Sequence, residues 1–341
     1  MKKMLILVAV VSLVAGALFA EEAVLIDFGL LTADTRIGNN PNYQGDDKTN
    51  DQNQRTIMDF DRVRFTGTFT ADQKASMKTS FAIQNWEVVL SSSSRTPTNM
   101  VLSFTKEATS KQYGKVLGVR VHFPIEAFNA SAVIKPPFEV PGYEPISEEN
   151  NTTDVSDVKT KFEEGYGLLK NVGTIKSVAV NVYGLNFPYG LWTNILFDDG
   201  TQKSLYMGHL NFDGWGELRW DNPAYIQEVR NRDLRLYPLY PDSMPFIKFN
   251  GFEVKRNSDQ IGGDFITYFK DVKVIYDKAV LDTDRDIDDE ALWKIIEDRE
   301  TARKLWQMER FGEQQVIRFI DNQKKATEST FTPTKTNEQT K

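Results

Sequence analysis

Apolar and polar side chains alternate in several short segments of the chain. Residues 62–66, 119–123, 177–182 and 271–276 each place an apolar side chain at every second position. A period of two gives one apolar and one polar face, which is typical of antiparallel strands that are buried on one side. A further apolar, β-like run covers residues 23–31. The pattern predicts a β-rich chain.

Asp199-Gly200 lies between two strand-like runs, residues 192–197 and 203–207. An Asp-Gly pair in this position indicates a hairpin, because both central residues of the tightest turns need a positive φ. Many short strands with turn signals, and no alternation with long helices, predict a mainly β fold. We expect an antiparallel β-sandwich or jelly roll of the galactose-binding type.

Polar stretches mark the expected loops of this body, which we place at residues 21–281. Residues 36–55 are dense in Asn, Asp, Gln and Gly, and we interpret them as a surface loop. Residues 136–160, rich in Pro, Glu, Asp, Asn and Ser, are interpreted as an exposed insertion between strands. Residues 162–169 are expected to form one or two helical turns.

The hydrophobic period changes towards the C-terminus. An acidic run at residues 282–290 precedes apolar residues that recur at helical spacing. Acidic side chains suit a helix N-terminus through the macrodipole. We therefore expect an amphipathic helical segment at residues 282–322, followed by a flexible polar tail at 323–341.

The N-terminus has the form of a secretory signal. Lys2 and Lys3 precede an apolar run that ends at Ala20, and small residues offer cleavage after Ala17 or Ala20. No later run reaches the ~18 apolar residues of a membrane helix. We expect residues 1–20 to be a cleaved signal peptide, and the remaining chain to be exported without membrane insertion.

Composition excludes several functional classes. The chain of 341 residues has no cysteine, which removes disulfides, thiol catalysis and cysteine-based metal sites. Its net charge of −7 argues against nucleic acid as a partner, because such binding relies on clustered Lys and Arg.

Residues that could support catalysis or metal binding are sparse. The two histidines, His122 and His209, lack metal-ligand spacing, and no nucleotide-binding or nucleophile motif occurs. The aspartates at 282, 284, 286 and 288 begin like a calcium loop. However, Ile287 and Trp293 occupy positions where that loop needs Gly and Glu. We therefore expect no catalytic residue, metal or cofactor.

Trp215 and Trp220 lie in an aromatic cluster interspersed with carboxylates. Aromatic rings and carboxylates on a sandwich surface can bind sugars, which makes a carbohydrate-binding protein or a glycan-processing enzyme the alternative function. The competing interpretation is packing in the core or at an interface, because aromatic side chains have large burial energies wherever they lie.

Several segments carry a resemblance to a known family. Residues 214–223, 234–241, 247–256 and 262–277 resemble the outer-layer (sheath) proteins of spirochaete periplasmic flagellar filaments. The plan of a signal, a β-rich body and a charged C-terminal segment resembles the same family. The resemblance is most specific from residue 184 to residue 277.

The resemblance implies a non-enzymatic structural subunit of the periplasmic flagellum. Such a subunit surrounds a flagellin core and supports motility by tuning filament stiffness and shape. Its expected partners are the flagellin subunits and neighbouring copies of itself or other sheath proteins. Trp293, Trp306 and Phe311 on the expected helix are candidate partner contacts, and the alternative is that this helix packs on its own sandwich.

Overall fold

The computed structural model describes residues 20–31, 57–58, 70, 73, 79–142, 162–232 and 245–279, with six further positions from 302 to 320. Its strands are β1 (Glu21–Asp27), β2 (Ile57–Met58), β3 (Thr79–Ser80), β4 (Glu87–Leu90), β5 (Phe104–Ser110), β6 (Gly114–Phe123), β7 (Ala130–Lys135), β8 (Leu168–Lys170), β9 (Val172–Leu185), β10 (Gly190–Phe197), β11 (Gln202–His209), β12 (Asp213–Asp221), β13 (Phe246–Arg256) and β14 (Gly263–Lys278). The helices are α4 (Pro97–Leu102) and α5 (Tyr225–Arg232), with 3-10 turns η1 (Phe28–Leu30), η3 (Ile83–Asn85) and η4 (Ser92–Ser94).

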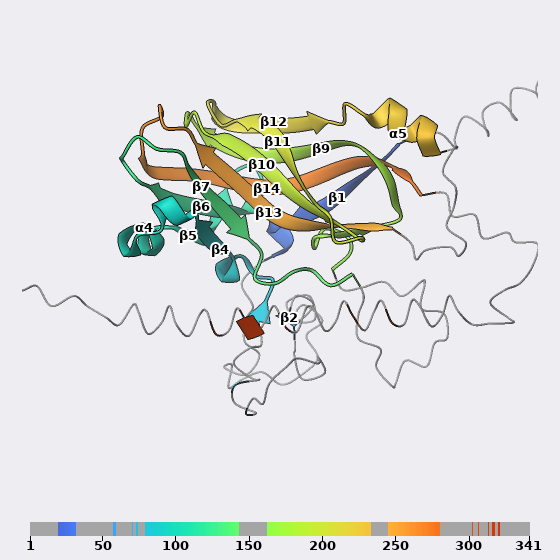
Figure 1. Cartoon of the computed structure of the whole chain (residues 1–341), viewed down its shortest axis with the longest axis horizontal. Coiled ribbons are helices and arrows are strands. Elements are labelled where there is room, and N and C mark those ends of the chain that lie inside the picture. The colour runs from blue at the N-terminus through green and yellow to red at the C-terminus, as the bar shows by residue number, and fades with distance from the viewer. Residues whose placement is uncertain are drawn as a thin grey trace, which may run out of the picture.

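Two six-stranded antiparallel sheets form the molecule's two layers (Figure 1). The first sheet has the order β12-β9-β14-β6-β5, and β1 also pairs with β14. The second has the order β11-β10-β13-β7-β4, and β8 also pairs with β13. The chain passes repeatedly from one sheet to the other, as in a jelly roll. The expected antiparallel sandwich is confirmed.

The alternating side chains explain why these segments pair and pack. Val178, Val180 and Val182 of β9 are fully buried, while Ala179 and Asn181 between them are not. Inward-facing side chains of the two sheets meet in one core, where the rings of Phe252 (β13) and Phe269 (β14) stack with centroids 4.1 Å apart. The alternations at 119–123, 177–182 and 271–276 lie in β6, β9 and β14, so these predictions are confirmed.

The hairpin at Asp199-Gly200 is confirmed, but its turn differs from the expected type. Only Gly200 has a positive φ, at 83°, and four residues connect β10 to β11. Thr201 N donates to Asp199 Oδ1 at 2.7 Å, and Gly200 N donates to Phe197 O at 3.0 Å. The longer connection removes the need for a second positive φ.

The prediction of one or two helical turns at residues 162–169 is wrong. The segment forms a turn, an isolated bridge at Tyr166 and then the start of β8. Glu164, Gly165 and Gly167 have φ values of 61°, 95° and 99°, which a right-handed helix cannot contain.

The sandwich has two distinct ends, set by the register of its long strands. At one end, the β6–β7 loop (124–129) lies beside the β13–β14 loop (257–262), and we call this pair the tip loops. The opposite end carries the β10–β11 turn, α5 and the start of β13. Figure 1 shows α4 and the orange β13–β14 loop on the left, and α5 on the right.

Several expectations lie wholly or largely outside the described residues. They are the signal peptide at 1–20, the strand at 62–66, the loops at 36–55 and 136–160, and the segments 282–322 and 323–341. In the C-terminal region only residues 302, 306, 313, 316, 317 and 320 are described, each in helical conformation. Within the described part of the chain, no helix is both long and apolar enough to cross a membrane.

Candidate functional site

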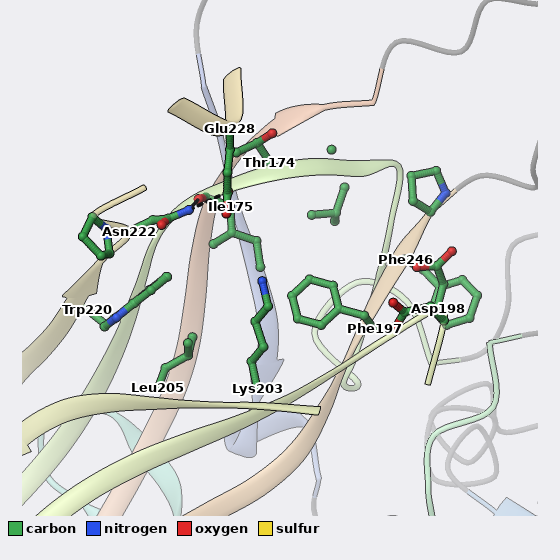
Figure 2. Close-up of a pocket in the computed structure, with 15 residues that line it drawn as sticks. Thr174, Ile175, Phe197, Asp198, Lys203, Leu205, Trp220, Asn222, Glu228 and Phe246 are labelled. Carbon is green, nitrogen blue, oxygen red and sulfur yellow. Dashed lines mark hydrogen bonds between the residues drawn. The ribbon is translucent and has the colours of Figure 1, made fainter. Parts of the chain in front are cut away.

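A cavity of about 400 Å³ lies at the end of the sandwich that carries α5 (Figure 2). We call it the end cavity. Its apolar lining comes from both sheets and includes Ile175, Phe197, Leu205, Trp220 and Phe246. A cavity of this volume with apolar lining and a few polar groups is typical of binding sites.

Asn222 fixes one edge of the end cavity. Its side-chain amide donates to Ile175 O at 2.8 Å and to Glu228 Oε2 at 2.9 Å, while its Oδ1 accepts from Ala224 N at 3.0 Å. The last of these bonds is an Asx turn that leads into α5. One side chain therefore joins β9, the end of β12 and α5 around the opening.

Lys203 places a positive charge in the end cavity. Figure 2 shows its side chain rising between Leu205 and Phe197, and its Nζ lies 4.9 Å from the centroid of the Phe197 ring. Lys203 has no carboxylate partner among the described residues. Asp198, Asp199 and Glu228 line the same cavity, so carboxylates outnumber ammonium groups in its described lining.

The outward face of the first sheet carries a separate aromatic cluster. Trp215 (β12) lies edge-on to Tyr183 (β9), with ring centroids 5.4 Å apart, and to Tyr113, at 4.8 Å. Tyr183 continues the row to Tyr268 (β14) at 5.9 Å. All four rings are half-buried, so they stabilise the sheet surface and still present apolar area to solvent.

Trp215 and Trp220 do not share a surface. Trp215 faces outward from β12, whereas Trp220 packs against the core and lines the end cavity. Successive side chains of a strand point to opposite faces, so two residues five positions apart must face opposite ways. The structure separates the two candidate sugar-stacking residues.

The two histidines have different surroundings. His122 Nδ1 lies 2.7 Å from Asp264 Oδ1, and Arg120 Nη2 donates to Asp264 Oδ2 at 2.8 Å. The Arg120 hydrogen bond, followed by that of His122, lowers the pKa of the Asp264 carboxyl. His209 packs edge-on against Tyr206. Among the described residues, no group of three or more His, Asp or Glu side chains could hold a metal ion.

Only one candidate of the C-terminal segment is described. Trp306 is 55% exposed, while Trp293 and Phe311 lie outside the described residues. Val316 is half-buried against the hydrophobic core. The assignment of Trp293, Trp306 and Phe311 as partner contacts therefore stays a prediction.

Sequence reasoning missed two parts of these surfaces. It did not place Tyr113, Tyr183 and Tyr268 around Trp215, nor Lys203 in a cavity with Trp220. The alternation in β9 held a signal for the first, because it puts Tyr183 on the outward face with Asn181. No sequence signal identified the end cavity, since its lining comes from segments far apart along the chain.

Similar solved structures include carbohydrate-binding modules. TmCBM61 in complex with β-1,4-galactotriose is 8% identical with a TM-score of 0.27, over 56% of this chain and 88% of that one. The family 11 module of cellulase Lic26A-Cel5E from Clostridium thermocellum is 9% identical with a TM-score of 0.25, over 56% and 88% of the two chains. At these values the likeness carries no argument about function.

Comparison of the sequence with known proteins identifies a family, which the likeness to solved structures does not. A protein named flagellar filament outer layer protein from Treponema pallidum (strain Nichols) is 45% identical over 98% of this chain and 97% of its own length. A protein of the same name from Spirochaeta aurantia is 41% identical, over 92% of this chain and 90% of its own. The family model described as "Flagellar filament outer layer protein Flaa" matches residues 49–285. The chain therefore belongs to the flagellar filament outer layer protein family.

Proposed function

We propose that this chain is a structural subunit of the outer layer of a periplasmic flagellar filament. It reaches the periplasm with a cleaved signal peptide, lies around a flagellin core and tunes the stiffness and shape of the filament. The role needs no catalytic residue, metal or cofactor. The observation that carries the proposal is the 45% identity, over 98% of the chain, to a protein named for this layer.

The fold suits a subunit that must resist deformation. Two sheets close on a continuous core in which large aromatic side chains interlock across the layers. Protein interiors packed in this way have low compressibility. Each contact with the core or with a neighbour can be weak, because a filament offers many contacts at once.

The test is made on periplasmic filaments purified from the native cell. We expect the chain to co-purify with them, with a mature N-terminus near residue 18 or 21, and we expect thinner filaments when its gene is deleted. Mass spectrometry and electron microscopy measure these two outcomes. Absence of the chain from washed filaments, with an unchanged diameter, would contradict the proposal.

The second candidate function is carbohydrate binding, supported by the aromatic cluster around Trp215. Rings that are half-exposed on a sheet face can stack on sugars. Because Trp220 faces the core, Trp215 would act with Tyr113 and Tyr183 in this case. This candidate becomes the leading one if the filament test fails.

A further inference from the structure

β12 is an open edge of the first sheet. Figure 1 shows it along one border of the sandwich, where it pairs on one side only, with β9. Its nine residues contain no proline, and its register with β9 runs from Asp213 to Asp221 without a shift. No segment within the described part of the chain pairs with its free side. A long, regular edge of this kind is a template for pairing with another strand.

Hydrogen bonds at both ends of β12 show which backbone groups are free. Asn186 N donates to Phe212 O at 2.9 Å, just before the strand. Asn222 N donates to Lys176 O at 2.9 Å, just after it. Hydrogen-bonded and non-hydrogen-bonded pairs alternate in an antiparallel ladder, so the even-numbered residues of β12 bond with β9. The odd-numbered residues from 213 to 221 therefore direct their N–H and C=O groups away from the sheet.

The other edge strands are shorter. β1 and β5 have seven residues each, β4 has four and β8 has three. β11 has eight residues, and its register with β10 shifts between Leu191 and Trp192, which marks a bulge. Short strands and bulges are devices that prevent pairing at an edge. β12 has neither of them.

Charged side chains also occupy the outward face of β12. Glu217, Arg219 and Asp221 are exposed. Arg219 Nε donates to Asp221 Oδ1 at 2.7 Å and keeps further N–H donors, whereas Glu217 has no ion pair within the described chain. Charges on an edge strand prevent pairing when like charges face each other. The signs alternate here, so the effect depends on the register of the partner strand.

We propose that β12 of one copy pairs antiparallel with β12 of a second copy, about a two-fold axis at Leu218. The pairing joins the first sheets of the two copies into one continuous sheet. This inference deepens the proposed function and rests on it, because it names a second copy of the chain as a partner within the outer layer. A second copy is the occupant because the exposed charges of β12 complement themselves in this register.

An axis at Leu218 opposes unlike charges. Glu217 of each copy then faces Arg219 of the other, so that two ion pairs cross the contact. Opposite charges that face each other on neighbouring strands stabilise the pairing. Odd-numbered residues also face odd-numbered residues, so the free N–H and C=O groups of the two strands bond with each other.

Neighbouring registers are less favourable. An axis at Glu217 or at Arg219 places that residue opposite itself, and like charges that face each other are destabilising. An axis at position 215 places Asp213 opposite Glu217. An axis at position 216 draws Gly214 into the paired stretch, where its φ of 98° lies outside the β region. The axis at Leu218 confines the pairing to residues 215–221, which excludes Gly214.

The symmetry of this contact determines what it builds. The same strand serves both copies, so the contact is isologous and stops at a dimer. Each two-copy unit presents every other surface of the molecule twice. Weak contacts of that unit with a filament therefore gain avidity, because the second contact forms within an already bound unit.

The first test uses disulfide cross-linking of the full chain, recovered from the periplasm of a bacterial host. The chain has no cysteine, so a single substitution introduces a single thiol. Leu218→Cys places two thiols opposite each other in a non-hydrogen-bonded pair, with Cα atoms ~4.5 Å apart. In the matched control Glu217→Cys the thiols are diagonal neighbours, ~7–8 Å apart. Non-reducing electrophoresis should show dimers at least ~10-fold faster for Leu218→Cys.

The second test reverses charges and measures the Kd of the dimer by sedimentation velocity. Glu217→Arg and Arg219→Glu each oppose like charges at two places, so each should raise the Kd by ~10-fold or more. The double variant Glu217→Arg/Arg219→Glu restores unlike pairs and should dimerise like the wild type. An equimolar mixture of the two single variants should form a mixed dimer. The matched control Lys273→Glu changes the same charge on β14, inside the same sheet, and should leave the Kd unchanged.

Several results overturn the proposal. They are equal cross-linking of Leu218→Cys and Glu217→Cys, a double variant that stays as monomeric as the single ones, and single variants that dimerise like the wild type. A wild-type chain that stays monomeric up to about 1 mM, the effective concentration that a shared filament core supplies, also overturns it. Thermal melts confirm that each variant is folded, and the charge variants change exposed residues only.

Cross-linking on native filaments separates this proposal from the proposed function. Filaments purified from cells that carry Leu218→Cys should yield the cross-linked dimer on oxidation. If the chain co-purifies with filaments but no dimer forms, only the strand pairing fails. If the chain is absent from filaments, the proposed function fails whatever the sedimentation result.

Discussion

Arg256 shows how one residue organises a whole end of this fold. Its side chain has no exposed surface, and its guanidinium donates to three main-chain carbonyls of the β6–β7 loop. The planar, forked group of arginine can satisfy several acceptors at once, whereas a lysine ammonium cannot reach them in the same geometry. The loop depends on this single cation for its conformation.

Replacing Arg256 with Met should therefore be severe. The carbonyls of Pro124 and Phe128 would lose their donor, whereas Glu126 O keeps its bond from Phe128 N, and we expect the free energy of unfolding to fall by about 3 kcal/mol. Urea denaturation measures the loss. Arg256→Lys should recover only part of it, and a Met variant as stable as the wild type would show that water replaces the guanidinium without cost.

Ionisation of the Asp271 carboxyl lowers the stability of the folded protein. Asp271 lies in β14 with 9% of its surface exposed, and burial raises the pKa of its carboxyl, with the nearby Asp27 acting in the same direction. A raised pKa in the folded state favours the protonated form. Its contribution to stability is thus present below the unfolded pKa and is lost as the pH rises through the folded pKa.

Asp271→Asn should consequently stabilise the protein at pH 7. The amide keeps the shape of the carboxyl without its charge, and we expect a Tm higher by a few degrees, since ~1 kcal/mol shifts Tm by about 2–4 °C at this size. Calorimetry between pH 3 and pH 7 tests the sign. The gain should shrink towards pH ~3, where both states hold a neutral carboxyl. A lower Tm at pH 7 would mean that Lys270 and Lys273 offset the burial.

At the scale of elements, a truncation can test whether the C-terminal segment serves folding or partner binding. Paired strands extend from Glu21 to Lys278, so the sandwich is closed before residue 282. A chain that ends at Ala279 should keep its β-sheet circular dichroism and melt cooperatively. It should lose at least ~10-fold in affinity for flagellin filaments if Trp293, Trp306 and Phe311 are partner contacts.

The control for this truncation is a full-length chain with Trp293, Trp306 and Phe311 replaced by Ala. Loss of filament binding in both variants, with folding intact, supports the partner-contact prediction. Loss of folding in the truncated chain supports the other interpretation, in which the segment packs on its own sandwich. The burial of Val316 against the core already points to some packing of this kind.

Strands were predictable from this sequence where one face is buried. β6, β9 and β14 alternate because their neighbours on both sides hold them in a half-buried sheet. α4 and α5 escaped prediction because they are short: Thr96 caps α4 through its side chain, and Asn222 leads into α5. The end cavity and the Arg256 cluster could not be predicted, since both depend on loops brought together by the fold.

At the scale of the whole molecule, the two ends of the sandwich differ. One end carries the tip loops, and the other carries the end cavity and α5. The strands run between the tip loops and the end cavity, so tension applied between the two ends is carried along the strands. The outward faces of the two sheets are separate surfaces from the two ends. A contact at one end and a contact on a sheet face can therefore form together without competing for one surface.

The pairing of β1 with β14 also sets the order of events when the molecule is made. The register joins Glu21 to Tyr276, across 255 positions of the chain (276 − 21). Contacts between such distant segments are slow to form, because a large loop must close first. The predicted signal implies that the chain crosses the membrane unfolded, N-terminus first. In that case β1 emerges first and cannot pair until β14 has also emerged. The sheet closes only when translocation is nearly complete, which keeps an open edge exposed throughout export.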